Sequence, residues 1–373
     1  MHFTIDHINN CGPARAGRLS LAHGQVHTPV FMPVGTQGTV KAMTVRDLEE
    51  TGAEMMLCNT YHLFLRPGCD SIAAAGGLHC FNRWQRPILT DSGGYQIFSL
   101  AQLRTITDAG AVFKSHIDGT AITFTPESVV KTQEAFGVDI MMQLDECPST
   151  TAGKQEVAAA VNRSILWARR SAAAWSRGES ALFGIVQGGL HADLREHSAR
   201  ELAGLDLPGY ALGGFSVGEE MGDAYPVMQQ AARMLPTDKP RYLMGVGFPE
   251  DIVRAVGFGI DMFDCVLPTR CARNGMCFTT QGRLKIRNAC YKDDRRPIDP
   301  ACTCYACRTY SRAYLRHLFM AGEITALMLM TLHNVFYYVS LCRRMRQAIL
   351  EDRFEQFSLD FFSSLTNGDP AES

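Results

Sequence analysis

Polar groups follow directly after short apolar segments at five points between residues 87 and 264. In chain order these groups are Asp91, Asp145, Gln187, the pair Gly213-Gly214 and Asp264. Any single carboxylate in such a place is explained equally well by a helix N-cap. A helix cap does not explain the group as a whole, if the three carboxylates, the amide and the open backbone site all lie at one end of the fold. They could supply a nucleophile, a general acid/base and hydrogen bonds to a polar planar ligand.

A second group of reactive side chains is the run Cys302-Thr-Cys304-Tyr-Ala-Cys307, with His333 further along the chain. Three thiolates and one imidazole complete the tetrahedral ligand set of a structural zinc ion. His333 could instead be a hydrogen-bonded core residue, as single histidines in apolar helices more often are. A closed site leaves no position for a substrate. We therefore expect one structural Zn²⁺ per chain, which joins a basic segment to the helix carrying His333.

The charges of the chain are unevenly distributed. The formal net charge is −2, yet the segment from Cys265 to Arg316 contains 11 Lys and Arg residues against 3 acidic ones. A solvated basic face is one explanation for such a segment. A charge split this large within one chain favours a polyanionic partner, and nucleic acid is the usual one.

Eight short apolar runs alternate with helical segments between residues 30 and 264. Runs of this length suit strands that are buried on both faces of a parallel sheet. Eight βα units predict an α/β fold of the (β/α)8 TIM-barrel type, whose active site lies at the carboxyl ends of the strands. A doubly wound open sheet is the alternative, but the stretch after the first run matches the glycine-rich loop of that fold poorly. The predicted strands are Val30–Val34, Glu54–Cys58, Pro87–Thr90, Val138–Leu144, Ala181–Val186, Tyr210–Gly213, Arg241–Met244 and Ile260–Phe263.

Two segments interrupt this alternation. Phe113–Phe124 alternates around Asp118-Gly119, which predicts an inserted β-hairpin with a two-residue turn. Residues 270–345 form a basic, zinc-binding subdomain after the eighth strand, within a single catalytic barrel domain over 1–373, and we expect 368–373 to be a flexible tail. Helix-capping signals occur at Thr44 to Asp47, at Thr125-Pro126 with Gly137, and at Pro249.

The sequence contains no pattern for export or membrane insertion. Its first ten residues lack a basic region followed by an apolar one. Polar residues interrupt the longest apolar stretch, Ile324–Leu341, so a buried helix fits it better than a membrane span. Most of the 13 cysteines are scattered singly along the chain. In a chain without an export signal, such cysteines are most often reduced and buried in the core. We therefore expect a cytoplasmic protein with no membrane contact.

Six motifs, taken together, resemble those of bacterial-type tRNA-guanine transglycosylases, also called queuine tRNA-ribosyltransferases. They follow the family's order and extend from about Thr28 to beyond His333. The strings Asp91-Ser-Gly-Gly-Tyr95-Gln and Phe263-Asp264-Cys-Val-Leu-Pro-Thr-Arg270 are highly specific in combination. The other four are Leu144-Asp-Glu-Cys147, Gly184-Ile-Val-Gln187-Gly-Gly, Gly213-Gly-Phe-Ser-Val-Gly-Glu219 and the Cys302/Cys304/Cys307/His333 set.

This resemblance implies a pentosyltransferase of queuosine modification. Its members exchange guanine at the wobble position of GUN-anticodon tRNAs for a 7-deazaguanine base. Replacing a base at C1′ with retention calls for double displacement through a covalent enzyme–RNA intermediate. By match, Asp264 is the nucleophile and Asp91 the general acid/base. The resemblance assigns binding of the base, once it has left its stack, to Asp91, Ser92, Gly93, Gly94, Tyr95, Asp145, Gln187 and Gly214.

Two loops after the seventh and eighth strands would hold the RNA. The first leads into a helix N-terminus, where backbone N–H groups favour phosphate, although a plain tight turn is the alternative. The second follows the nucleophile, and its two arginines could contact the bases and phosphates beside the target. The predicted RNA-binding residues are Gly245, Val246, Gly247, Phe248, Pro249, Glu250, Asp251, Thr269, Arg270, Cys271, Ala272 and Arg273.

Two other functions compete with this one. A non-catalytic RNA-binding relative could dispense with the carboxylates, but Asp91 and Asp264 both stand in full motifs. A barrel glycosidase acting on free sugars would leave the zinc cluster and the basic segment unexplained. Because the bacterial branch of the family forms homodimers, we expect a homodimer here.

The identity of the incoming base depends on four positions. Cys147 and Val217 resemble the bacterial pattern, in which the base is the 7-aminomethyl compound preQ1. Phe215 and Ser216 depart from that pattern, and Ser216 matches the eukaryotic branch, which takes the bulkier queuine. We predict preQ1, with queuine as the alternative.

Overall fold

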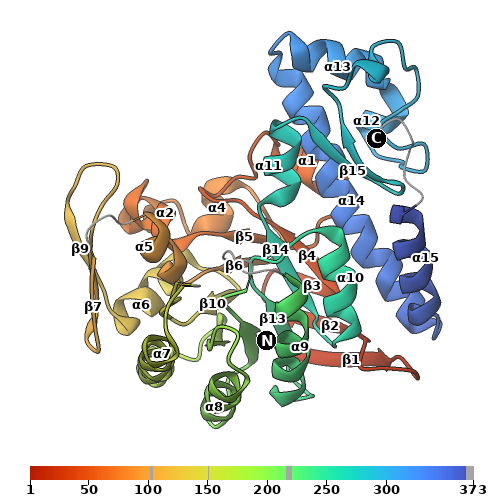
Figure 1. Cartoon of the computed structure of the whole chain (residues 1–373). Helices are drawn as coiled ribbons and strands as arrows, with labels where there is room; N and C mark the ends of the chain where they lie inside the picture. Colours follow the sequence, from red (N-terminus) through yellow and green to blue (C-terminus); the bar gives the residue numbers. More distant parts are fainter. Residues whose placement is uncertain (101–103, 150, 216–220, 367–373) are drawn as a thin grey trace.

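The computed structural model describes residues 1–100, 104–149, 151–215 and 221–366. Eight parallel strands form one sheet in the order β4-β14-β13-β12-β11-β10-β6-β5. A bridge between Val34 and Leu57 joins the two ends of this order and closes a barrel (Figure 1). The strands are β4 (Val30–Pro33), β5 (Met56–Cys58), β6 (Ile88–Thr90), β10 (Ile140–Met142), β11 (Ala181–Val186), β12 (Gly209–Leu212), β13 (Arg241–Leu243) and β14 (Met262–Cys265). Each predicted apolar run contributes one strand, so the (β/α)8 prediction is confirmed.

Helices cover the outside of the barrel, and several begin at the predicted caps. In α6 (Pro126–Phe136) the Thr125 side chain accepts from the amide of Ser128, and the helix ends at Gly137 in the left-handed conformation. Inside the barrel, side chains such as Met32, Leu89 and Phe183 fill the core and leave no pore. The other helices up to β14 are α1 (Val45–Glu50), α2 (Thr60–Leu65), α3 (Cys69–Ala74), α4 (Leu78–Asn82), α5 (Gly94–Leu100), α7 (Lys154–Ala174), α8 (Ala192–Ala203), α9 (Met221–Met234) and α10 (Pro249–Gly257).

The inserted hairpin is present, but its turn differs from the prediction. Strands β8 (Gly110–Lys114) and β9 (Ala121–Phe124) pair through Lys114 and Ala121, so six residues connect them instead of two. A two-residue type I′ turn needs positive φ at both central residues, and of Asp118-Gly119 only the glycine has it. The Asp118 side chain accepts instead from the amide of Thr120 within the wider loop. A third strand, β7 (Arg104–Thr107), extends the insertion.

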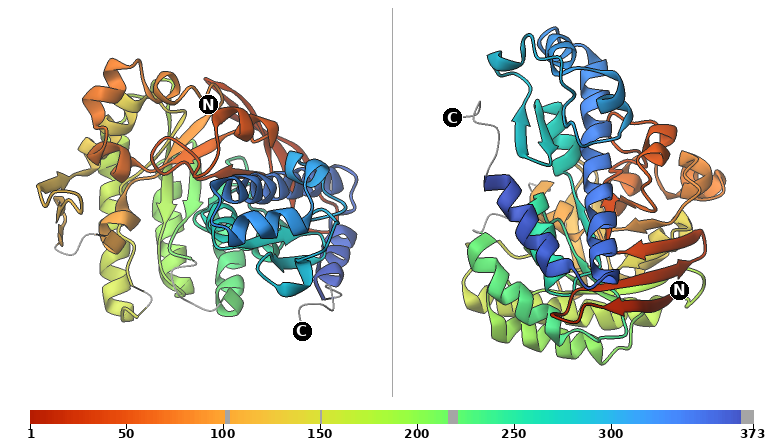
Figure 2. Two further views of the ribbon diagram at one scale, coloured as in Figure 1. Left: turned by 90° about the horizontal axis from the view of Figure 1, so that it is seen from above. Right: turned by 90° about the vertical axis from the view of Figure 1, so that its right-hand side faces the viewer.

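An antiparallel sheet that the apolar pattern did not predict covers the amino-terminal end of the barrel. It consists of β1 (His2–Ile8), β2 (Arg15–Leu21) and β3 (Gly24–Thr28). Arg15 forms a buried ion pair of 2.6 Å with Asp261, just before β14. His23, in the turn between β2 and β3, contacts Asp139, just before β10. These contacts attach the sheet to that end of the barrel, beside which its strands lie in the right-hand view of Figure 2.

The chain after β14 builds a separate layer beside the carboxyl end of the barrel. Its elements are α11 (Leu267–Arg273), β15 (Met276–Thr279), β16 (Gly282–Lys285), η1 (Ala289–Tyr291), α12 (Tyr305–Thr309), α13 (Arg312–Met320), α14 (Ile324–Leu350) and α15 (Phe354–Thr366). Helix α14 runs from this layer down the side of the barrel (Figures 1 and 2). By length and composition it could cross a membrane, but 67% of its most apolar window is buried within the protein. It is a core helix, as predicted.

Candidate active site and metal centre

The three carboxylates predicted from the strand ends lie at the carboxyl end of the barrel. Asp91 follows β6, Asp145 lies beyond β10, and Asp264 is the next-to-last residue of β14. Each is buried, with at most 9% of its surface exposed. Within the described part of the chain none of them forms an ion pair. The barrel therefore gathers three buried carboxylates that only neutral groups solvate.

Neutral donors hold both oxygens of Asp91. The Asn59 and Gln96 side-chain amides donate to Oδ2 at 2.6 and 2.8 Å, and the Thr60 backbone amide donates to Oδ1 at 2.8 Å. Burial raises the pKa of Asp91 to about 6, and the nearby charge of Asp264 acts in the same direction against these hydrogen bonds. A carboxyl group with such a pKa gives up and takes back a proton near neutrality, as a general acid/base must.

Asp264 is held through one of its two oxygens. The Tyr242 hydroxyl donates to Oδ1 at 2.5 Å and the Gly245 amide donates to the same oxygen at 2.8 Å. No donor in the described residues contacts Oδ2. Burial raises the pKa of Asp264, while the Tyr242 and Gly245 donors oppose the rise. Burial and the same carboxylate raise the pKa of Tyr242 well above its ordinary value, so this phenol stays a donor. One carboxylate oxygen is thus fixed and the other is available.

Asp145 links the groups predicted to bind a planar ligand. The Ser92 hydroxyl donates to Oδ1 at 2.7 Å and the Gln187 amide donates to Oδ2 at 2.8 Å. Burial raises the pKa of Asp145. The carbonyl Oε1 of Gln187 is buried without a hydrogen-bond partner and faces Gly214, where an added Cβ would lie 2.5 Å from it. The structure therefore brings together four groups from four strand ends.

The segment from Gly93 to Tyr95 forms one side of the same site. Gly93 has a φ of +82°, and a Cβ on Gly94 would lie 2.4 Å from the carbonyl oxygen of Asp145, so only glycine fits there. Tyr95, at the start of α5, is 49% exposed beside these buried groups. Its ring is therefore accessible to solvent next to the buried groups of the site.

The loop from Gly245 to Asp251, predicted to bind RNA, presents little of its surface to solvent. Gly245 is exposed, whereas Val246, Gly247, Pro249 and Asp251 are buried. The Asp251 carboxylate accepts from the Phe248 amide at 2.8 Å and so occupies a donor of the α10 N-terminus that was expected to face phosphate. The Glu250 side chain pairs with Arg283. Gly245 is the member of this loop that reaches the site, through Asp264.

The segment after the nucleophile candidate divides into two faces. Thr269, Arg270 and Arg273 line a cavity of about 340 Å³, whereas Cys271 and Ala272 are turned into the core. Lys41 lines the same cavity from the loop after β4. Three cations therefore line one open space, which Val266, two residues after Asp264 in the chain, also lines, and such a cluster of positive charge suits a polyanion.

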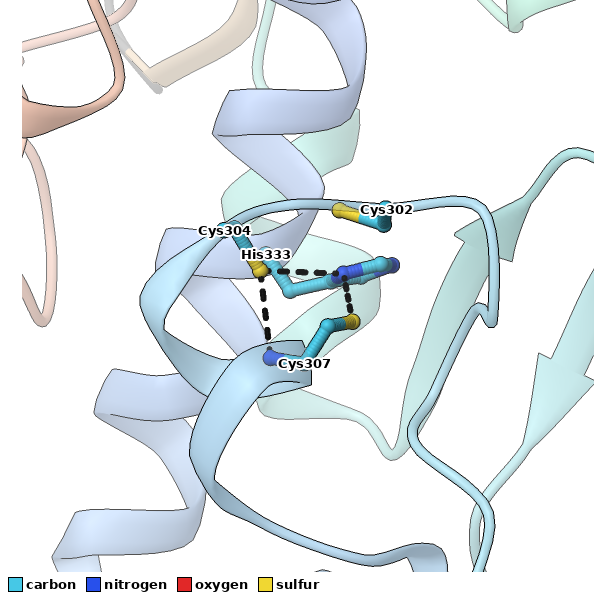
Figure 3. A group of neighbouring side chains, drawn as sticks. All are labelled: Cys302, Cys304, Cys307 and His333. Carbon is cyan, nitrogen blue, oxygen red and sulfur yellow. Dashed lines mark hydrogen bonds between the residues drawn. The ribbon is translucent and has the colours of Figure 1, made fainter.

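The four predicted metal ligands form one cluster, shown in Figure 3. The Sγ atoms of Cys302, Cys304 and Cys307 and the Nδ1 atom of His333 all lie within 4.8 Å of one another. His333 Nδ1 is 3.5 Å from the Cys304 sulfur and 3.2 Å from the Cys307 sulfur, close to the separation of about 3.6 Å between ligands of a tetrahedral zinc ion. Its other nitrogen donates to the Phe278 carbonyl at 2.8 Å, which leaves Nδ1 as the ligand atom. This donor set fits Zn²⁺.

A second histidine group lies at the opposite end of the barrel. His23 and His79 stack with ring centroids 3.6 Å apart, and both face the buried carboxylate of Asp139. Stacked rings direct their lone pairs side by side, so they do not converge on one ion as metal-binding imidazoles do. Both Asp139 oxygens also accept backbone amides, from His23 and Ile88. This group attaches the β2–β3 turn to the barrel.

Several residues of the site were not predicted from the sequence. Asn59 and Thr60 stand directly after β5, so the strand-end argument that selected Asp91 would also have found them. Gln96 lies five residues after Asp91 on α5 and had no signal beyond its motif. Tyr242 lies inside β13, where an aromatic residue is typical of a core, and only the fold shows that it reaches Asp264. Lys41 belongs to a loop with no motif.

Comparison with known proteins identifies the family of this chain. The family model described as Queuine tRNA-ribosyltransferase matches residues 10–367. The queuine tRNA-ribosyltransferase of Moorella thermoacetica is 52% identical over 366 residues, 98% of each chain. Those of Desulforamulus reducens and Desulforudis audaxviator are each 53% identical and cover 95% and 94% of this chain, and 96% and 95% of their own. The chain belongs to the queuine tRNA-ribosyltransferase family.

Proposed function

We propose that the chain is a tRNA-guanine transglycosylase that replaces guanine with preQ1 at the wobble position of tRNAs with a GUN anticodon. The observation that carries this proposal is the asymmetric setting of Asp264. Tyr242 and Gly245 fix its Oδ1, and no donor among the described residues occupies Oδ2. A carboxylate held in this way is oriented for attack on a sugar carbon.

The first half of the exchange uses both buried carboxylates. Asp264 Oδ2 attacks C1′ of the ribose, and the bond from C1′ to guanine breaks with its electron pair going to the base. Asp91, in its protonated form, gives a proton to the departing guanine. The products are neutral guanine, an ester between Asp264 and the RNA, and an Asp91 carboxylate.

The second half reverses these roles. The Asp91 carboxylate takes the N9 proton of preQ1, N9 attacks C1′, and the ester bond to Asp264 breaks with its electron pair returning to the carboxylate. Because burial places the pKa of Asp91 at about 6, the group can hold the proton in one half and release it in the other. Two displacements give retention at C1′.

The remaining groups of the site bind the base and the RNA. Asp145, Gln187 and the Gly214 backbone would contact the polar edge of a purine, with Tyr95 against the base or a neighbouring nucleotide. Lys41, Arg270 and Arg273 would hold phosphates around the flipped nucleotide.

The metal centre supports the surface that surrounds the site. Cys302, Cys304, Cys307 and His333 would hold one zinc ion, whose role is structural because the four ligands leave no open position. This ligation ties α12 to α14, which also packs against α11 and its arginines. We take residues 270–345 as the subdomain organised in this way, within one catalytic domain.

We also propose that the enzyme acts as a homodimer in the cytoplasm. Tyr305 and Tyr314 are each more than 40% exposed, and Tyr314 stacks with Tyr310. Uncovered aromatic groups of this kind are enriched at protein interfaces. Analytical ultracentrifugation of the full chain tests the dimer.

Incubation with unmodified tRNA and labelled guanine tests the reaction class. We expect label to enter the RNA without strand cleavage, and preQ1 to displace it. Competition between preQ1 and queuine for one tRNA then tests the base, and a higher kcat/KM for queuine would overturn the preQ1 assignment. Release of free sugar, or RNA binding without exchange, would favour the glycosidase or the non-catalytic relative.

A further inference from the structure

Arg195 is a fully buried arginine behind the predicted base site. It lies near the start of α8 and has no exposed surface. Its Nε donates to the Gly189 carbonyl at 2.8 Å, and its Nη1 donates to the Val186 carbonyl at 3.1 Å. These two carbonyls flank Gln187 and Gly188 in the chain. One rigid guanidinium therefore fixes both sides of the turn that carries Gln187.

The same guanidinium also touches the neighbouring strand end. Its central carbon lies 3.8 Å from the centroid of the Phe215 ring, a cation–π contact at close range. Phe215 is 2% exposed and directly follows Gly214. Arg195 thus connects the turn after β11 to the segment after β12, the two places that provide Gln187 and Gly214.

The backbone around this pair is too crowded for larger side chains. A Cβ on Gly188 would lie 2.7 Å from Cγ of Arg195. A Cβ on Gly213 would lie 2.7 Å from the Gln187 amide nitrogen. The spacing between the Gln187 amide and the Gly213-Gly214 turn is therefore narrow and is set from behind by Arg195 and Phe215.

We propose that Arg195 and Phe215 act as a positioning pair that sets the gap between Gln187 and Gly214 and thereby the affinity for the incoming base. This inference rests on the proposed function, because it takes those two groups as the base-binding edge. Neither member of the pair touches the reacting atoms. The Phe215 ring is committed to Arg195, so it supports the wall of the site and does not narrow the space for the base.

Steady-state kinetics of Arg195→Lys and Phe215→Leu, measured separately for base and tRNA, test the pair. Lysine keeps the charge but loses the planar fork and the stacking face, and leucine loses the aromatic face. We expect the KM for preQ1 to rise about tenfold in each variant, while the KM for tRNA stays within about twofold. Phe215→Tyr, which keeps an aromatic face, should restore the KM for preQ1.

Arg241→Lys is the matched control. Arg241 is also buried and also donates to a backbone carbonyl, that of Leu235, but it lies at the amino-terminal end of the barrel. We expect this variant to lower the melting temperature without raising the KM for preQ1. If Arg195→Lys does not fold, Phe215→Leu carries the test alone.

Four outcomes separate the inference from the proposed function. An unchanged KM for preQ1 in Phe215→Leu, or equal rises for preQ1 and tRNA, would overturn the positioning pair while leaving the exchange reaction intact. A KM for preQ1 in Phe215→Tyr that is as high as in Phe215→Leu would also overturn the positioning pair. A wild-type enzyme that exchanges no base at all would refute the proposed function instead.

Discussion

The two ends of the barrel both bury aspartates but surround them differently. At the carboxyl end, Asp91, Asp145 and Asp264 receive hydrogen bonds from neutral amides and hydroxyls, and burial raises the pKa of all three. At the amino-terminal end, Arg15 neutralises Asp261 and two histidines face Asp139.

The pKa of Asp139 moves in the opposite direction. Burial alone would raise it, but hydrogen bonds from His79 and from the backbone amides of Ile88 and His23 outweigh burial, and the pKa falls below its ordinary value. The same residue type is therefore a fixed anion at one end and a proton-exchanging group at the other. A buried carboxylate whose neighbours leave its charge uncompensated indicates chemistry, whereas a paired one indicates architecture.

The largest difference between the ends should appear when the nucleophile candidate is neutralised. In Asp264→Asn an amide replaces the attacking oxygen, so we expect base exchange to fall by about 10⁴-fold or more and the covalent RNA adduct to vanish. Folding and much of the tRNA binding should persist. Denaturing gels of enzyme mixed with tRNA measure the adduct. A stable adduct on this variant would place the nucleophile elsewhere, with Asp91 as the first candidate.

Loss of the metal should lower stability and tRNA affinity at the carboxyl end of the barrel more than it lowers the rate of base exchange. Cys304→Ser removes one of four ligands, and structural zinc sites contribute about 10 kcal/mol or more to folding in isolated peptides. We expect a lower melting temperature and weaker tRNA binding. Because the barrel has its own core, guanine exchange in tRNA that is already bound should keep a near-normal rate. Thermal unfolding and tRNA titration measure these two changes, and metal analysis of the purified wild type measures its zinc content. Purified wild type without zinc, or normal tRNA affinity in the variant, would contradict the structural role.

The aspartate at the other end should give the opposite result. Asp139→Asn replaces a buried acceptor of the His23 and Ile88 backbone amides that also faces His79, and leaving these buried groups without a full set of partners costs about 3 kcal/mol or more in sum. We expect reduced stability with unchanged kcat for exchange, measured by urea unfolding and single-turnover kinetics. A large loss of kcat without loss of stability would mean that this end of the barrel also takes part in the reaction.

The sequence predicted the barrel well because each strand is a short apolar run buried on both faces, from Val30 to Phe263. It predicted the metal ligands because Cys302, Cys304 and Cys307 are close together in the chain. The Asp118-Gly119 turn was wrong because Asp118 does not take a positive φ, which depends on the register of the hairpin. The sheet over the amino-terminal end of the barrel was not predicted, because its strands His2–Ile8 and Arg15–Leu21 contain no continuous apolar run.

The sequence predicted those residues of the site that lie at the carboxyl ends of strands. Asp91, Asp145 and Asp264 stand where a barrel exposes side chains, so their meeting follows from the fold. Tyr242 reaches Asp264 from within β13, and Arg195 reaches the turn that carries Gln187 from helix α8. Only three-dimensional packing brings them there. Ser216 and Val217, on which part of the base prediction depends, lie outside the described residues, as does the tail over 368–373.

The smallest expected effect is a gain of stability at the active end. Unfolded Asp91 titrates near 3.8 and the folded group at about 6, so above pH 6 its buried charge costs about 3 kcal/mol of folding free energy. Asp91→Asn removes that charge, and the free carbonyl of Gln96 can turn to accept from the new amide. We expect the variant to be more stable than wild type at pH 8, by up to this amount.

This advantage should shrink as the pH falls, because wild-type Asp91 then takes up a proton in the folded state. It should decline from pH 6 and disappear below pH 4, where the group is protonated in both states. Urea unfolding at pH 8, 6.5 and 5 measures the trend, with Asp139→Asn as the control. That variant should be less stable than wild type throughout this range, because the stabilising charge of Asp139 is lost only below its lowered pKa. An Asp91→Asn variant that is less stable than wild type at pH 8, or a gain that does not change with pH, would mean that burial does not penalise the Asp91 charge. The contrast between the two ends would then rest on geometry alone.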